Sequence, residues 1–450
     1  MTVLPLTEAR LTAYAAMLQA EGRLPSLAIG VVRGSGLEWW CGRGSVDGAA
    51  TTDQVQYRLG SITKTLTAVA VMRARDEGLL SLDDPVGTHL SGTPYADRTL
   101  GQLLSHSAGL AAESPTPWWE RTAGEDWPQF VDRLSAQDLK HPAGRRFHYS
   151  NLGYGVLGEV LSRVRQRPWG DVVRDEVLLP LGMTRTTPRP QAPSAQGYAV
   201  HPWADVLLRE PEHDAGAMAP AGQLWGTLRD LGRLAAFLLG DTGDVLAAAT
   251  LAEMQEPAGI DAASTGWSAY GLGLQVIRLD GRTLVGHGGS MPGFLAGVFV
   301  DPAEQAGAVV LTNATNGLSP TALPGLLDVL RACEPYVVPA WEPLRDVDQE
   351  SLELTGTWYW GPSSYGLRLA ADGLLHLTGL QGAGRGSRFR RDGSSWLGLD
   401  GYHAGETLRP VHDGGELVAL DLGSFVYSRA PYDDRAPIPG GVDPAGWQPV

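Results

Sequence analysis

Ser61 and Lys64 are the residues whose types and spacing point most directly to chemistry. They lie three positions apart in Gly60-Ser61-Ile62-Thr63-Lys64, and on a helix residues i and i+3 share a face. A serine hydroxyl becomes an effective nucleophile when a neighbouring base takes its proton. The spacing alone is equally consistent with a helix-capping serine followed by a solvated lysine.

The choice of basic residues strengthens the chemical interpretation of Lys64. Of the 35 basic residues, Lys64 and Lys140 are the only lysines, and all the others are arginines. Arginine keeps its proton at any biological pH, whereas a buried lysine can lose its proton and act as a base. The sequence therefore predicts that Ser61 is a nucleophile and that Lys64 handles its proton.

Tyr149 and Asn151 form a second candidate group, directly before the helix-like run Leu152–Val164. A tyrosine can donate or accept a proton, and an asparagine can orient Lys64 or hold a substrate carbonyl. The alternative is a packed tyrosine and a helix cap. Asn151 is one of only three asparagines in the chain, which favours a functional role.

A third group comprises His287, Gly289 and Ser290, in a Gly-His-Gly-Gly-Ser segment that follows the strand-like Thr283–Val285. Glycines beside a strand let a substrate approach the backbone closely. A free N–H there, together with that of Ser61, would form an oxyanion hole. We expect this segment to bind substrate; the alternative for His287 is a loop histidine with structural hydrogen bonds.

The elements that must position these groups alternate between strand-like and helix-like patterns up to about residue 335. Strands at both ends with helices between them predict an α/β (α+β) fold, a sheet flanked by helices with a helical insertion. The expected helices start near Thr7, run from Ser61 to near Gly78, and cover Leu323–Ala332. The expected strands are Ser26–Arg33, Leu37–Gly42, Tyr270–Arg278, Thr283–Gly286, Leu295–Val300 and Ala308–Asn313.

The last hundred residues have a different texture. Short alternating runs are broken by Asp372-Gly373, Asp392-Gly393 and Asp413-Gly414, which are dipeptides typical of hairpin turns. We expect three parts: a hydrolase domain over residues 1–336, a linker over 337–350, and a small antiparallel β barrel or sandwich over 351–450.

Composition and charge exclude several function classes. A net charge of −15 argues against nucleic-acid binding, which needs a concentrated positive surface. No apolar run reaches the roughly 18 residues that span a bilayer, and the N-terminus lacks a signal-peptide pattern. We therefore expect a cytoplasmic protein without a membrane span, with Cys41 and Cys333 as reduced thiols. No sequence pattern supports a metal site, a P-loop or any cofactor.

Ser-x-x-Lys, Tyr-x-Asn and His-x-Gly in this order resemble the serine β-lactamase-like hydrolases. These include class C β-lactamases, penicillin-binding-protein-type carboxypeptidases, D-aminopeptidases and related esterases. The resemblance covers about residues 8–335 and includes Thr99–Leu110 and His287–Phe294. It implies an acyl-enzyme on Ser61, with base and acid duties shared by Lys64 and Tyr149. The C-terminal β domain looks like the accessory domains that some members carry.

The same resemblance implies further roles in binding. Asn151 would contact the substrate amide and Lys64, and the N–H groups of Ser61 and Ser290 would form the oxyanion hole. The departure is His287, since β-lactamases and carboxypeptidases usually have a lysine there that binds a substrate carboxylate. Neutral histidine supplies no fixed cation.

We therefore expect a serine hydrolase that is esterase-like or D-aminopeptidase-like and acts on a small ester, amide or short peptide. One rival is a β-lactamase or D-Ala-D-Ala carboxypeptidase on the same machinery, and another is an inactive binding protein on this fold. The oligomeric state stays open.

Two further features flank the motifs. His106, in a Ser-His-Ser turn, is expected to pin a loop because Lys64 already fills the role of base. Trp118, Trp119 and Trp127 lie between the first two motifs. They would either line an apolar pocket or pack the helical insertion.

Overall fold

The computed structural model describes residues 3–262, 267–381, 384–423 and 425–431. The chain divides into two compact units, Met1–Tyr336 and Val337–Val450. Among the described residues, no helix combines the length and the apolar character needed to cross a membrane.

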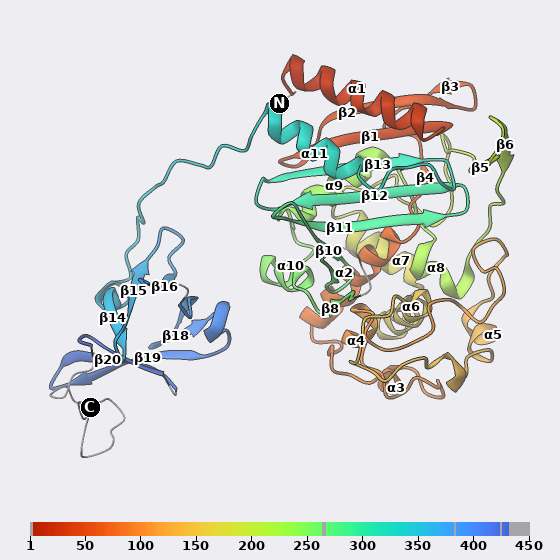
Figure 1. The fold of residues 1–450 in the computed structure, drawn as a ribbon. Helices are drawn as coiled ribbons and strands as arrows, with labels where there is room; N and C mark the ends of the chain where they lie inside the picture. Colours follow the sequence, from red (N-terminus) through yellow and green to blue (C-terminus); the bar gives the residue numbers. More distant parts are fainter. Residues whose placement is uncertain (1–2, 263–266, 382–383, 424, 432–450) are drawn as a thin grey trace. The chain divides into compact units, whose positions relative to one another are not determined.

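The first unit is built on a nine-stranded antiparallel sheet in the order β3-β2-β1-β13-β12-β11-β10-β9-β8 (Figure 1). The N-terminal hairpin joins the later strands because β1 pairs with β13, with Leu27 opposite Thr312. The sheet is therefore assembled from distant segments, as predicted. Its strands are β1 (Ser26–Arg33), β2 (Gly36–Val46), β3 (Ala49–Ala50), β8 (Gly259–Ile260), β9 (Ser268–Tyr270), β10 (Gln275–Leu279), β11 (Arg282–Met291), β12 (Phe294–Asp301) and β13 (Ala306–Thr312).

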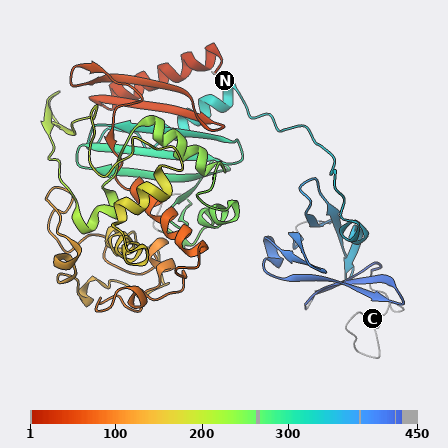
Figure 2. The same cartoon turned by 180° about the vertical axis from the view of Figure 1, so that it is seen from behind.

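Helices cover both faces of this sheet (Figures 1 and 2). On one face, α1 (Pro5–Glu21) and α11 (Ala322–Cys333) pack in an apolar cluster that includes Leu11, Ile29 and Leu326. On the other face lie α9 (Leu228–Leu238) and α2 (Ile62–Asp76), whose buried residues belong to the larger core. Helix α2 is buried almost throughout, because it runs between the sheet and the helical layer.

The helical layer is the predicted insertion. It contains α3 (Val86–His89), α4 (Leu100–Leu104), α5 (Trp127–Val131), α6 (Asn151–Arg165), α7 (Trp169–Val173), α8 (Ala219–Gly222) and α10 (Ala248–Gln255). Two short strands, β4 (Tyr57–Arg58) and β7 (Trp225–Gly226), pair just before α2 and after α8. This pairing brings the start of α2 close to the end of α8, where the candidate site lies.

Two sequence expectations about strands need correction. The single strand expected over Tyr270–Arg278 is two strands, because the chain turns between them, closed by a 2.8 Å bond from the Gly271 N–H to the Leu274 carbonyl. The Gly-His-Gly-Gly-Ser segment was expected to follow a strand, yet it lies within β11, paired with β12 as far as Met291 opposite Phe294. The pairing persists because Gly293, with a φ of +82°, allows a tight hairpin turn there.

The second unit contains α12 (Gln349–Leu354) and a closed antiparallel barrel of eight strands, β14 to β21. The three Asp-Gly dipeptides lie at or next to hairpin turns of this barrel, as predicted. Trp358, Phe389, Trp396 and Tyr427 fill its apolar interior. Its strands are β14 (Gly356–Trp360), β15 (Ser363–Leu369), β16 (Leu375–Gly379), β17 (Ser387–Asp392), β18 (Ser395–Gly398), β19 (Thr407–Asp413), β20 (Glu416–Leu422) and β21 (Phe425–Ser428).

Candidate active site

Ser61 and Lys64 meet at the N-terminal end of α2. Ser61 is the residue before the helix and Lys64 lies in its first turn, so that Nζ is 3.0 Å from the serine Oγ. Nζ also donates a 2.7 Å hydrogen bond to the carbonyl of Ala221 in α8. Nζ therefore bridges the Ala221 carbonyl and Ser61 Oγ, and in its neutral form the amine has a lone pair that can accept the serine proton.

Burial decides the protonation of Lys64. Its side chain is completely buried, and this loss of solvation lowers its pKa to about 7, although the charges of Glu113 and Glu120 work in the opposite direction. Removing an ammonium from water disfavours its charged form. Near neutral pH a large share of the molecules therefore carries a neutral amine beside the serine.

Tyr149 completes this centre. Its hydroxyl is hydrogen-bonded to Ser61, and its ring centroid lies 5.0 Å from Lys64 Nζ. Burial raises the pKa of Tyr149 well above its usual value, more than the bond with Ser61 lowers it. The side chain is consequently a neutral phenol near neutral pH, able to donate a proton.

His106 holds the loop that carries Tyr149. Its Nδ1 accepts a 3.0 Å hydrogen bond from the Ser150 N–H, and its ring lies 4.2 Å, centroid to centroid, from that of Tyr149. The ring is buried, and burial together with the charge of Lys64 lowers its pKa well below the usual range. These contacts agree with the expectation that His106 pins a loop.

Strand β11 brings its glycine-rich segment against the start of α2. Gly60 has a φ of +54°, and a Cβ added to it would lie 2.6 Å from the Ser290 nitrogen. A Cβ on Gly289 would lie 2.0 Å from the carbonyl oxygen of Leu59. Only glycine permits these approaches, which set the backbone of Ser290 beside the residue that precedes Ser61.

His287 is turned into the protein. Its Nε2 lies 2.8 Å from the hydroxyl of Tyr270, and its Nδ1 lies 2.5 Å from the Gly288 carbonyl. Burial lowers its pKa to about 3, and Lys64 adds to that effect. The imidazole is therefore neutral near pH 7.

Asn151 faces a carboxylate. At the first residue of α6, its side-chain nitrogen lies 3.0 Å from both oxygens of Glu113. Trp119 Nε1 donates to the same carboxylate at 2.6 Å. The resemblance implied a contact with Lys64, but this amide nitrogen is directed to Glu113.

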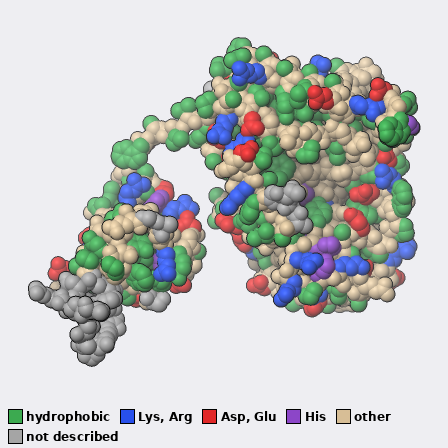
Figure 3. Space-filling model, in the orientation of Figure 1, with side chains coloured by type: hydrophobic (Ala, Val, Ile, Leu, Met, Phe, Trp, Pro, Cys, Tyr) green, Lys and Arg blue, Asp and Glu red, His purple; other side chains and the backbone are tan. Residues whose placement is uncertain are grey.

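Glu113 and Glu120 are site residues that the sequence reasoning missed. The negative charges of both carboxylates raise the pKa of Lys64 and that of Tyr149. Burial, and secondarily the charge of Glu113, raises the pKa of Glu120. The tryptophan-rich stretch was the available signal, since Trp118, Trp119 and both carboxylates line one cavity of about 430 Å³. On the face shown in Figure 3, the unit is hollowed between the sheet and the helical layer.

The arginines around this cavity are balanced by acids. Arg121 forms an ion pair with Glu210 at 3.1 Å. Arg58 is buried and donates a hydrogen bond to Gln223. Burial lowers the pKa of Arg58 to about 10, although the charges of Glu212, Glu120 and Asp214 work in the opposite direction. Trp118 is 70% exposed and Trp119 is buried, so the first forms an outer wall and the second packs the insertion. Trp127 borders a different cavity, beside α6.

Comparison with known proteins agrees with this architecture. Residues 11–330 match the family model described as Beta-lactamase, and residues 347–429 match a domain of unknown function, DUF7586. Penicillin-binding protein 4 of Amycolatopsis lactamdurans is 30% identical over 331 residues, covering 68% of this chain and 82% of that protein.

Two solved structures are similar as well. The octameric penicillin-binding protein homologue from Pyrococcus abyssi has a TM-score of 0.65 at 20% identity, covering 93% of this chain and 99% of its own, and shows a shared fold. The D-stereospecific amidohydrolase from Streptomyces sp. has a TM-score of 0.60 at 26% identity, covering 73% and 98%. With its Ser–Lys pair at the start of α2 and the family match over most of its length, the chain belongs to the beta-lactamase family.

Proposed function

We propose that this chain hydrolyses an ester or amide through an acyl-enzyme on Ser61. The observation that carries the proposal is the buried Lys64 amine 3.0 Å from Ser61 Oγ, with a pKa of about 7. Ser61 Oγ attacks the substrate carbonyl while its proton passes to Lys64, and the N–H groups of Ser61 and Ser290 receive the oxyanion. Tyr149, a neutral phenol, relays the proton from Lys64 to the leaving group, so that both side chains are neutral again. Water then attacks the acyl-enzyme by the reverse path.

We further propose that the preferred acyl group carries a protonated amine near the scissile bond, as in an amino acid amide. Glu113 and Glu120 place negative charge in the cavity that also contains Trp118 and Trp119. Carboxylates and aromatic faces both attract an organic ammonium. His287, buried and bonded to Tyr270, adds no positive charge near Lys64. The similarity to a D-stereospecific amidohydrolase supports an amide substrate.

A matched substrate series tests this function. Alanine p-nitroanilide, its N-acetyl form and its N-succinyl form share one leaving group but carry an ammonium, no charge and a carboxylate. We expect the highest kcat/KM for the free amine. The Glu120→Gln variant should lower that preference about tenfold, or ~1.4 kcal/mol, because one of the two carboxylates becomes neutral.

The Glu125→Gln variant is the control, since Glu125 pairs with Arg133 and lies outside the cavity lining. A wild type that prefers the succinyl substrate would contradict the ammonium proposal and support the β-lactamase or carboxypeptidase alternative. A protein that neither turns over these substrates nor forms a Ser61 adduct with a fluorophosphonate would be a binding protein on this fold.

A further inference from the structure

The carbonyl that orients Lys64 is itself held by a buried side-chain network. Ala221 belongs to α8, a helix of only four residues, whose position depends on what packs around it. Two threonines of α2 form hydrogen bonds with this segment, one on each side of Ala221. Thr67 Oγ1 lies 3.1 Å from the Pro220 carbonyl, and the Leu224 N–H donates to Thr63 Oγ1 at 3.2 Å.

Thr67 in turn receives a hydrogen bond from outside α2. The indole Nε1 of Trp169, the first residue of α7, donates to Thr67 Oγ1 at 3.1 Å. Thr67 is fully buried, and its hydroxyl also lies 3.0 Å from the Thr63 carbonyl. Its one proton is therefore shared between the Thr63 and Pro220 carbonyls, while one of its two lone pairs accepts the hydrogen bond from the indole.

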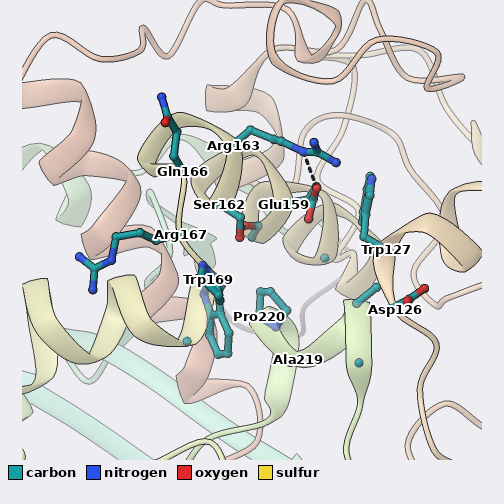
Figure 4. Close-up of a pocket in the computed structure, with 16 residues that line it drawn as sticks. Asp126, Trp127, Glu159, Ser162, Arg163, Gln166, Arg167, Trp169, Ala219 and Pro220 are labelled. Atoms are coloured by element: carbon teal, nitrogen blue, oxygen red, sulfur yellow. Dashed lines mark hydrogen bonds and ion pairs between the residues drawn. The ribbon is translucent and has the colours of Figure 1, made fainter.

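Trp169 and Pro220 meet at the wall of a cavity beside α6. Figure 4 shows the Trp169 ring next to Pro220, and both residues line this cavity of about 730 Å³. On the α6 side, a Cβ on Gly158 would lie 2.0 Å from Pro220 Cγ. Pro220 is thus enclosed by α6, Thr67 and Trp169, so that α8 has little freedom to move.

We propose that Thr67 and Trp169 are positioning residues for catalysis, which hold the Ala221 carbonyl where it directs the amine of Lys64 toward Ser61. The inference rests on the proposed function, because it assumes that Lys64 is the base. Neither residue touches the substrate site; each acts through α8. A displacement of about 1 Å in a catalytic group lowers rates about a hundredfold, so holding this carbonyl has a direct effect on acyl transfer.

The network also affects the proton equilibrium of Lys64. A carbonyl bonds more strongly to an ammonium than to a neutral amine, so loosening α8 disfavours the charged form. The other titratable groups that face Lys64 are Tyr149 and Tyr154 through their rings, Glu113 and Glu120 through their charges, and the neutral His106 and His287. Substitution of Thr67 leaves all of these groups in place.

The test is the pH dependence of Ser61 labelling by a fluorophosphonate in the full-length protein. Serine attack forms the O–P bond, fluoride leaves, and the serine proton goes to Lys64. Thr67→Val removes the hydroxyl at constant shape. We expect the second-order rate constant for labelling of this variant to fall at least about tenfold. The acidic limb of its pH–rate profile, where protonation of Lys64 lowers the rate, should move to lower pH by about half a unit. Thr67→Ser, which keeps the hydroxyl, should stay within about threefold of wild type.

Thr65→Val is the matched control on the same helix. Thr65 is equally buried but donates to the Gly273 carbonyl at 2.8 Å, so its loss should weaken the fold without moving the acidic limb. If Thr67→Val does not fold, Trp169→Phe, which keeps a ring but loses the indole donor, should show the same shift to a smaller extent.

The inference would be overturned if the acidic limb stays unchanged in Thr67→Val or, where that variant does not fold, in Trp169→Phe. It would also be overturned if the limb moves equally in Thr65→Val. Either result would leave the proposed function intact. A wild type that forms no Ser61 adduct would instead overturn the proposed function and the inference together.

Discussion

We expect the buried Lys64 to make the stability of this protein depend on pH. A variant without the Lys64 amine should lack this contribution. The side chain is completely buried, and its pKa falls from the usual 10.5 to about 7 on folding. Between these two pKa values the unfolded chain binds more protons than the folded chain, so stability rises with pH. Below pH 7 both states carry the charge, and the folded state bears the full desolvation penalty.

The size of this effect follows from the shift. One pKa unit corresponds to about 1.36 kcal/mol, so between pH 7 and pH 9 wild type should gain about 2 to 3 kcal/mol relative to a variant without the amine. Lys64→Met keeps the shape of the chain and cannot titrate. It leaves the Ala221 carbonyl without its partner, at a pH-independent penalty of about 1 to 3 kcal/mol. The pH dependence of the difference therefore isolates the buried charge.

Urea unfolding of both proteins at pH 6, 7, 8 and 9 measures this difference directly. Lys140→Met provides the control, because Lys140 is the other lysine of the chain and is exposed. Because desolvation requires burial, the Lys64→Met and Lys140→Met differences from wild type should diverge as the pH rises. A Lys64→Met difference that stays constant from pH 7 to pH 9 would refute the lowered pKa and the assignment of Lys64 as the base.

Three other predictions concern the same centre. Ser61→Ala should abolish the fluorophosphonate adduct, seen by intact mass, while the protein stays folded; an adduct on this variant would remove Ser61 as the nucleophile. Lys64→Arg should retain less than about a tenth of the activity, a loss of at least ~1.4 kcal/mol, because a guanidinium keeps its proton; higher activity would make Tyr149 the sole base. Tyr270→Phe should lower the free energy of unfolding by about 1 to 3 kcal/mol, because the buried His287 loses its partner; thermal unfolding at wild-type temperature would contradict this.

Local patterns were sufficient to predict most elements of the fold. The apolar periodicity of the first helix, the hairpin at Ser26–Arg33 and the Asp-Gly turns of the barrel all depend on residues near one another in the chain. The strand over Tyr270–Arg278 was mispredicted because its interruption depends on contacts with a distant segment. A Cβ on Gly271 would lie 2.1 Å from the Met254 carbonyl, and no local pattern reveals such a neighbour.

The residues of the candidate site also differ in whether local sequence patterns could predict their contacts. Ser61 and Lys64 are three residues apart at the start of one helix, so their contact is a property of helix geometry and was predictable. Glu113 and Glu120 belong to an irregular stretch, and they come near Lys64 only because the helical layer folds over α2. The sequence placed Asn151 in the site, but its carboxylate partner became evident only in three dimensions.

The sequence by itself determined the family, the order of the elements and the contact between Ser61 and Lys64, because these follow from residue types at short spacing. Tertiary structure alone decided the protonation of the site. Burial of Lys64 among α6, α8 and the sheet lowers its pKa to about 7, and burial of His287 makes the imidazole neutral. Desolvation depends on all the atoms that exclude water from a group. These atoms come from segments more than a hundred residues apart, so their joint effect cannot be obtained from spacing along the chain.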